Sequence, residues 1–210
     1  MVIAGCYDGL MTIELYDNPV SGHAHRVRLF LSLLDLEHES IEVNMREGEH
    51  KTADYLKLSP LGQVPTLIDD DVIITDSCAA LVYLAKRYGD DHWLPDDPEG
   101  AARVQRWLST ASGELYRGPV IARAIELFGR DFDYDAAAQW SDRLLPWMQS
   151  ELTDRTWLAD DHATIADVAM YSYLRVADEG GLDITDYPAI ERWLADVEQL
   201  DGFIPMTRSG

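Results

Sequence analysis

Apolar and polar residues follow different patterns in the two halves of the chain. In the first half, short runs rich in β-formers alternate with stretches in which apolar residues recur at helical spacing. Strands are predicted at residues 11–16, 41–43, 65–68 and 72–75. Helices are predicted at residues 21–34, 51–58 and 76–87. The order β-α-β-α-β-β-α predicts a small mixed sheet covered by helices on its faces.

Beyond a polar, proline-punctuated stretch, the rest of the chain has helical periodicity only. Pro119 and Pro146 fall inside the first two of these helices and are expected to kink or break them. Thr164 and Asp167 predict a capping box, which serves folding rather than chemistry. The predicted helices cover residues 99–128, 134–153, 164–179 and 187–200. We therefore expect an extension at 1–10, a sheet-containing domain at 11–89, a linker at 90–98 and an all-helical domain at 99–210.

Composition narrows the class of protein. The 210 residues are 47% hydrophobic, which is typical of a globular chain, and the net charge of −21 disfavours nucleic acid or an anionic membrane as a general partner. The two cysteines, Cys6 and Cys78, show no metal-type spacing, so we expect a reduced, cytoplasmic protein without a metal or structural disulfides. On such an acidic chain, a binding site for an anionic ligand would need a local cluster of positively charged side chains.

The candidate chemistry begins at Pro65, the first residue of a predicted strand. Proline cannot donate to a sheet ladder, so Val64 before it presents its backbone N–H and C=O outward. Asp76 and Ser77 open the next helix, where free N–H groups and the helix dipole suit a carboxylate and Asp76 suits an ammonium. Together they predict a site for an extended, peptide-like ligand with an amino-acid head. Taken singly, Pro65 could be a turn residue and Asp76 or Ser77 an ordinary N-cap.

Three ordered segments carry a family resemblance: residues 59–67, 75–77 and 164–167. With the element order, they resemble the cytosolic glutathione transferase family, which implies a thioredoxin-like domain followed by an all-helical domain. The resemblance implies a cis bond before Pro65. It also implies that Gln63, Val64 and Pro65 border the cysteinyl unit of glutathione and that Asp76 and Ser77 hold its γ-glutamyl head. Most relatives carry Glu in place of Asp76.

The catalytic residue implied by the resemblance is Ser21, because residues 14–21 resemble the start of bacterial theta- and phi-like members with a catalytic serine. Its hydroxyl would stabilise the glutathione thiolate at the start of a helix. Asn18 and Tyr16 are alternatives, and His23 or His25 could also act. An ordinary N-cap is the structural alternative for Ser21.

The rest of the site is also implied by resemblance. His50 and Lys51 would hold the glycyl carboxylate, with a solvated loop as the alternative reading. The electrophile pocket would lie between Val20 and the first long helix of the second domain. Candidates on that helix are Arg106, Trp107, Ser112, Tyr116 and Arg117.

The function that follows is a homodimeric enzyme that conjugates glutathione to a small electrophile. A glutathione-dependent peroxidase or disulfide reductase is the first alternative. It is disfavoured because no cysteine occupies the position of Ser21. A glutathione-transferase-like binding protein without catalysis is the second alternative.

Overall fold

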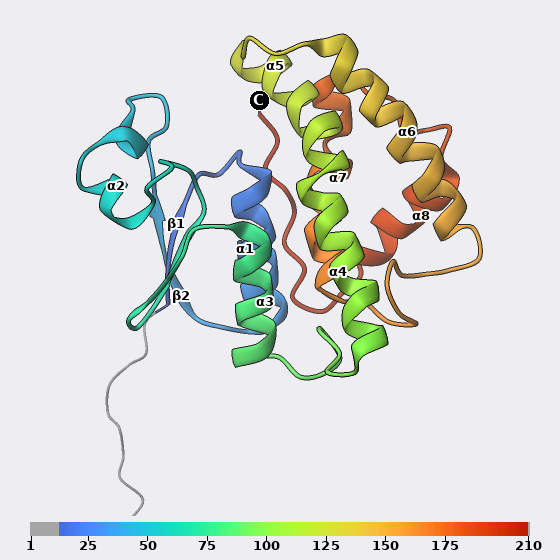
Figure 1. Ribbon diagram of the computed structural model, residues 1–210, viewed down its shortest axis with the longest axis horizontal. Helices are drawn as coiled ribbons and strands as arrows, with labels where there is room; N and C mark the ends of the chain where they lie inside the picture. The colour runs from blue at the N-terminus through green and yellow to red at the C-terminus, as the bar shows by residue number, and fades with distance from the viewer. Residues whose placement is uncertain (1–12, 210) are drawn as a thin grey trace, which may run out of the picture.

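The computed structural model describes residues 13–209 and contains one four-stranded sheet. Its strands lie in the order β2-β1-β3-β4 (Figure 1). β1 pairs in parallel with β2 and antiparallel with β3, and β3 pairs antiparallel with β4. The strands are β1 (Ile13–Asp17), β2 (His38–Glu42), β3 (Thr66–Asp69) and β4 (Val72–Ile74).

Helices cover both faces of this sheet. α1 (Gly22–Leu33) and α3 (Ser77–Arg87) lie side by side on the face toward the helical half, and α2 (Tyr55–Leu58) lies on the other side (Figure 1). α1 is buried along most of its length because it packs between the sheet and the helical half. A 3₁₀ turn, Glu49–Lys51, precedes α2.

The helical half is built around α7 (Ile165–Arg175), whose residues are nearly all buried. α7 packs against α1 and α3 on one side and against α4 and α8 on the other (Figure 1). The remaining helices are α4 (Pro98–Ser112), α5 (Ile121–Phe128), α6 (Tyr134–Leu152) and α8 (Pro188–Val197). Within residues 13–209, no helix is long and apolar enough to cross a membrane.

Asp167 fastens the start of α7 to the surrounding loops. The predicted capping box is present: the Thr164 N–H donates to Asp167 Oδ2 at 2.9 Å, and the Ala166 N–H donates to Thr164 Oγ1 at 3.2 Å. Asp167 Oδ1 also accepts from the Leu158 N–H at 3.0 Å and from Trp193 Nε1 at 2.9 Å. These bonds satisfy a buried carboxylate, which confirms its structural role.

The predicted fold class is confirmed, and several element bounds are corrected. The helix predicted at 99–128 breaks before Pro119 into α4, a π-helical turn at Tyr116–Val120 and α5. Pro146, in contrast, does not break α6, which runs on as a single helix.

Other corrections concern where elements begin and end. The helix predicted at 164–179 ends at Arg175 and is followed by a 3₁₀ turn, Ala177–Gly180. The second strand begins three residues earlier than predicted, at His38. The predicted extension at 1–10 lies outside the described residues, and the boundaries at 89 and 99 stay predictions.

Candidate active site

One cavity of about 590 Å³ lies between the sheet-side loops and the helical half. It brings together residues that are far apart in the sequence: the loop after β1, the loop before β3, the start of α3 and the segment from α4 to beyond α5. The predicted residues in its wall are Asn18, Val20, Ser21, His23, Gln63, Val64, Pro65, Asp76, Ser77, Ser112 and Tyr116.

The loop before β3 presents an open backbone edge to this cavity. The Val64–Pro65 bond is cis, as the resemblance implied. Two side chains fix the backbone of Gln63, because its C=O accepts from the Tyr55 hydroxyl at 2.8 Å and from Ser59 Oγ at 3.0 Å. Within residues 13–209, neither the N–H nor the C=O of Val64 takes part in a backbone hydrogen bond. Val64 can therefore pair with an extended ligand.

The start of α3 forms the next part of the wall. Asp76 is the N-cap, and its Oδ1 accepts from the Ala79 N–H at 2.8 Å, so the capping reading is correct. Ser77 follows it at the first helical position, where backbone N–H groups have no partner inside the helix. Capping uses one carboxylate oxygen of Asp76, so the second oxygen can still accept from an ammonium group. Capping and ligand binding are therefore compatible here.

Ser21 stands at the start of α1. Its N–H donates to the Asn18 carbonyl at 2.9 Å, and its Oγ accepts from the Ala24 N–H at 3.3 Å. The hydroxyl proton is thus free to donate into the cavity. At Gly22, a Cβ atom would lie 2.7 Å from the Tyr173 ring, so only glycine allows α1 to approach α7 this closely beside Ser21.

The two main alternatives to Ser21 are placed differently. Asn18 lines the cavity, and its Nδ2 donates to the Val43 carbonyl at 3.3 Å. Tyr16 is not in the cavity wall, and its ring packs against Tyr55 with a centroid distance of 6.0 Å. Burial, together with Glu14, raises the pKa of the Tyr16 hydroxyl.

The two early histidines are neutral at physiological pH. His23 lines the cavity, and burial, with a smaller effect from the Arg26 charge, lowers its pKa to about 3. His25 lies outside the cavity wall and is fully buried. Its Nε2 donates to the Ile204 carbonyl at 3.0 Å and its Nδ1 accepts from Ser172 Oγ at 2.9 Å, while burial lowers its pKa to about 4. His25 therefore has a packing role.

His50 and Lys51 lie against Leu61 and Gly62, outside the cavity wall. Lys51 Nζ donates to the carbonyls of Leu61 and Gly62 at 3.2 and 3.3 Å, which holds the loop in place. Gly62 has φ +61°, and a Cβ atom there would come within 2.5 Å of the His50 carbonyl. Burial, then the charges of Lys51 and Arg130, lowers the pKa of His50. Its buried Nδ1 has no hydrogen-bond partner among the described residues.

Of the residues predicted on the helical half, Ser112 and Tyr116 lie in the cavity wall and the other three do not. Trp107 lies in the core with 1% of its surface exposed, and its Nε1 donates to the Leu158 carbonyl at 2.8 Å. Arg106 pairs with Glu151 at 2.9 Å, outside the cavity wall. Arg117, also outside the wall, lies 4.9 Å from the Trp140 ring. Sequence reasoning missed the lining residues Met45, Val120, Ile121, Phe128, Arg130 and Phe132.

The local cluster of positively charged side chains expected for an anionic ligand is formed by arginines. Arg26, Arg123 and Arg130 line the cavity, and Asp76 is the one acidic residue among the described residues of its wall. None of the three was predicted from the sequence. Arginine spacing along these helices carries no signal that distinguishes a cavity wall from a solvated surface.

Arg123 links the loop before Ser21 to the helical half. Its Nη1 donates to the Val20 carbonyl at 2.8 Å, and its Nε pairs with Glu179 Oε2 at 2.7 Å. Both side chains are almost fully buried. Glu179 Oε1 in turn accepts from the N–H and hydroxyl of Ser209. These partners are distant in the sequence, so no local motif announces the contact.

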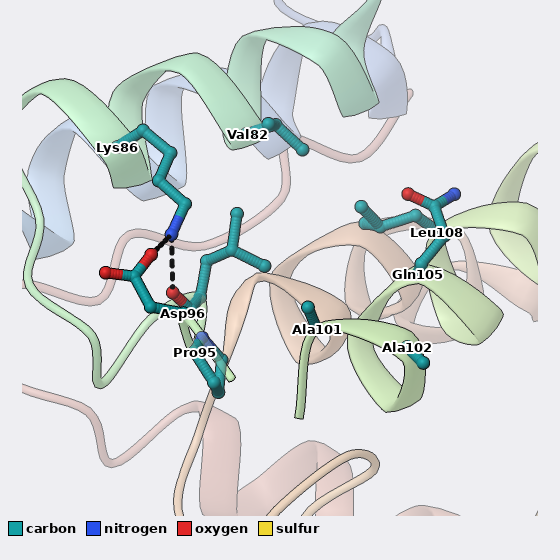
Figure 2. A pocket seen from close by; sticks show the side chains of 9 residues that line it. Val82, Lys86, Pro95, Asp96, Ala101, Ala102, Gln105 and Leu108 are labelled. Atoms are coloured by element: carbon teal, nitrogen blue, oxygen red, sulfur yellow. Dashed lines mark hydrogen bonds and ion pairs between the residues drawn. The ribbon is translucent and has the colours of Figure 1, made fainter. Parts of the chain in front are cut away.

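A second cavity, of about 490 Å³, lies between α3, the predicted linker and α4. Figure 2 shows Lys86 of α3 reaching toward the linker, where its Nζ donates to the Leu94 carbonyl at 3.2 Å and pairs with Asp96. Val82 and Leu108 also line it. None of the predicted site residues is in its wall.

Fold and site together define a class of protein. A thioredoxin-like sheet domain offers an open backbone edge and a helix N-terminus, and an all-helical half closes the cavity over a serine hydroxyl. Such a site suits a short, extended peptide that has an amino-acid head at one end and a reactive side chain in its middle.

The comparisons with known proteins agree with this class. The family model for the glutathione S-transferase N-terminal domain matches residues 20–87, and the model for the C-terminal domain matches residues 120–201. The chain therefore belongs to the glutathione S-transferase family, and the prediction of a glutathione transferase is confirmed. Membership of the serine-type subclass stays a proposal.

Individual relatives match over most of their length. Glutathione S-transferase 1 of Manduca sexta is 30% identical over 198 residues, which cover 91% of this chain and 90% of the relative. A glutathione S-transferase structure from Pseudomonas fluorescens Pf-5 aligns with a TM-score of 0.87 and 29% identity, covering 93% of this chain and 99% of that one. A Drosophila mojavensis glutathione transferase homologue, solved with bound glutathione, aligns with a TM-score of 0.82 and 28% identity and covers 91% of this chain and 89% of that one.

Proposed function

We propose that this protein conjugates the thiolate of glutathione to a small electrophile, with Ser21 as the catalytic residue. The observation that carries the proposal is the shared cavity: Ser21 lies in the same wall as the open Val64 edge and the Asp76–Ser77 helix start. The family membership supports glutathione as the substrate.

In this proposal the backbone of Val64 pairs with the cysteinyl unit. Asp76 accepts from the γ-glutamyl ammonium, and Ser77 donates to the γ-glutamyl carboxylate. Lys51 holds the glycyl carboxylate by charge, acting from its place on the Leu61 and Gly62 carbonyls, and His50 donates a hydrogen bond to it as a neutral imidazole. Each contact matches the chemistry of one unit of the tripeptide.

The chemical step needs a thiolate, and a free thiol with a pKa of about 8.5 is mostly protonated at neutral pH. The Ser21 hydroxyl donates a hydrogen bond to the sulfur, and the N-terminus of α1 adds positive potential, so both lower the thiol pKa. The released proton passes to solvent. The sulfur then attacks an electrophilic carbon, a carbon–sulfur bond forms, and the leaving group departs with its electron pair.

The electrophile is proposed to lie between Val20 and the aromatic side chains of the helical half. Tyr116, Phe128 and Phe132 line this side, and each is at least 41% exposed. Such a wall suits a small, apolar or aromatic electrophile.

Calorimetric titration with glutathione and turnover of 1-chloro-2,4-dinitrobenzene test this function together. We expect saturable binding of glutathione and conjugation that depends on the protein. In Ser21→Ala, turnover should fall by at least tenfold, while glutathione affinity should change less, because the other contacts remain. Binding without turnover in the wild-type protein would favour a non-catalytic binding protein, and absence of binding would refute the proposal.

We also propose a homodimer in the cytoplasm. The edge strand β4 supports the dimer, because Val72 and Ile73 on it are 41% and 47% exposed. An apolar, unpaired sheet edge is a liability unless something covers it. Light scattering should give twice the chain mass of 23.7 kDa, and Ile73→Lys should shift the population toward the monomer. A monomeric wild-type protein at micromolar concentration would contradict the dimer.

A further inference from the structure

Arg26 is a buried cation for which the surrounding protein provides no carboxylate. Its side chain extends from α1 to the wall of the main cavity and is 1% exposed. It takes part in none of the ion pairs within residues 13–209. Its Nε and Nη2 are buried and have no hydrogen-bond partner there. A buried charge without a partner lowers the stability of the folded protein, so its presence here needs a functional explanation.

The contacts that Arg26 does make point to Ser77. Nη1 donates to Ser77 Oγ at 3.1 Å and to His23 Nδ1 at 3.0 Å. The guanidinium carbon lies 5.6 Å from the centre of the Tyr173 ring. Burial and the Arg26 charge keep His23 neutral, since its pKa is lowered to about 3, so this nitrogen can accept. Cys78 Sγ also lies 4.0 Å from Nη1, but Ser77 and His23 are the nearer acceptors, and the two Nη1 hydrogens are used on them.

This geometry determines what the Ser77 hydroxyl can do. Its oxygen accepts from Arg26 on one side, so its own proton is left to donate elsewhere. Ser77 is the first residue of the eleven-residue helix α3, whose open N–H groups also favour an anion. The Arg26 side chain, Ser77 and the start of α3 thus lie together in one cavity wall.

We propose that Arg26 is a positioning residue for the carboxylate of the γ-glutamyl head. It orients the Ser77 hydroxyl as a donor and supplies positive charge that the protein leaves uncompensated until that carboxylate binds. This inference rests on the proposed function, because it assumes that glutathione occupies the cavity. It predicts that Arg26 lowers the stability of the free protein and raises its affinity for the ligand.

The Arg26→Met variant separates this role from a structural one. Methionine keeps an unbranched apolar stem and removes the unpaired charge. Replacing buried ionic groups with apolar residues is often neutral or stabilising. We expect a melting temperature that is unchanged or higher, together with glutathione binding weakened by about 10- to 100-fold, as for the loss of a charged hydrogen bond. A lower melting temperature with unchanged affinity, or a variant that fails to fold, would overturn the proposal.

A ligand analogue identifies which group Arg26 serves. In 4-aminobutanoyl-cysteinylglycine the γ-glutamyl unit lacks only its α-carboxylate. The wild-type protein should prefer glutathione over this analogue, and the preference should shrink in Arg26→Met. Arg26→Lys is the conservative control: it keeps a charge but cannot span Ser77 and His23, so it should restore part of the preference.

The outcomes distinguish a failure of this inference from a failure of the proposed function. A wild-type protein that binds neither glutathione nor the analogue refutes the proposed function. A wild-type protein that binds glutathione, with an Arg26→Met variant that retains the full preference, refutes the role of Arg26 alone.

Discussion

The buried pair of Arg123 and Glu179 gives the sharpest stability prediction. In Glu179→Gln the shape is kept, but the Arg123 guanidinium loses its counter-charge while it stays almost fully buried. Breaking a buried pair in this way costs about 3–5 kcal/mol. For a chain of this length, 1 kcal/mol corresponds to about 2–4 °C, so the melting temperature should fall by about 6–20 °C.

The neighbouring residue provides a matched control. Asp178 pairs with Arg208 at 2.8 Å, but their side chains are 63% and 46% exposed. An exposed pair contributes at most about 1 kcal/mol, so Asp178→Asn should lower the melting temperature by no more than about 4 °C. Scanning calorimetry of the two variants compares the same chemical change at adjacent positions.

Turnover should also depend on the Arg123–Glu179 pair. Arg123 also holds the carbonyl of Val20, so releasing it loosens the backbone next to Ser21. We expect kcat for the Glu179→Gln variant to fall more than its glutathione affinity, because the Val64 and Asp76 contacts lie elsewhere. The double variant Arg123→Met/Glu179→Gln should recover much of the stability but not the activity. A melting temperature for Glu179→Gln equal to that of Asp178→Asn would refute this account of the pair.

Two further predictions concern α1. Gly22→Ala should cost about 1–3 kcal/mol and reduce turnover, because the new Cβ would lie 2.7 Å from the Tyr173 ring, and an unchanged melting temperature and rate would contradict the close contact. His25 has a folded-state pKa of about 4, below its unfolded value near 6.5. The unfolded chain therefore binds more protons between these values, and stability that is complete above pH 6.5 should fall by about 2 kcal/mol from this residue at pH 5. Denaturation curves at pH 7 and pH 5 check this, and His25→Gln should show a smaller fall.

Local patterns in the sequence predicted much of the sheet domain and the open backbone edge at Val64. Pro65 at a strand start and Asp76–Ser77 at a helix start are local signals, because each residue acts on its own backbone. The break before Pro119 was predictable for the same reason. The effect of Pro146 was not predictable in this way. Helix α6 stays intact there, with Leu145 and Met148 packed in the core beside the proline.

Residues whose role depends on long-range contacts escaped prediction. Trp107 has the same helical spacing whether it faces the core or a cavity, and the structure places it in the core. Arg26 and Arg123 act on Ser77 and Val20, which are 51 and 103 residues away. Lys51 was expected to hold a ligand carboxylate, which stays a prediction, but its hydrogen bonds to two loop carbonyls were not foreseen. Only the tertiary structure determines these partners.

The role of Ser21 is tested most directly by the pKa of the bound glutathione thiol. Ultraviolet absorbance of the thiolate, followed against pH at saturating glutathione, measures it in the wild-type protein and in Ser21→Ala. A hydrogen bond to a charged group contributes about 1.5–3 kcal/mol, so the bound thiol should titrate below its free value of about 8.5, and Ser21→Ala should raise its pKa by about 1–2. Asn18→Ala should leave it unchanged. Identical titration curves for the wild-type protein and Ser21→Ala would contradict the proposed mechanism.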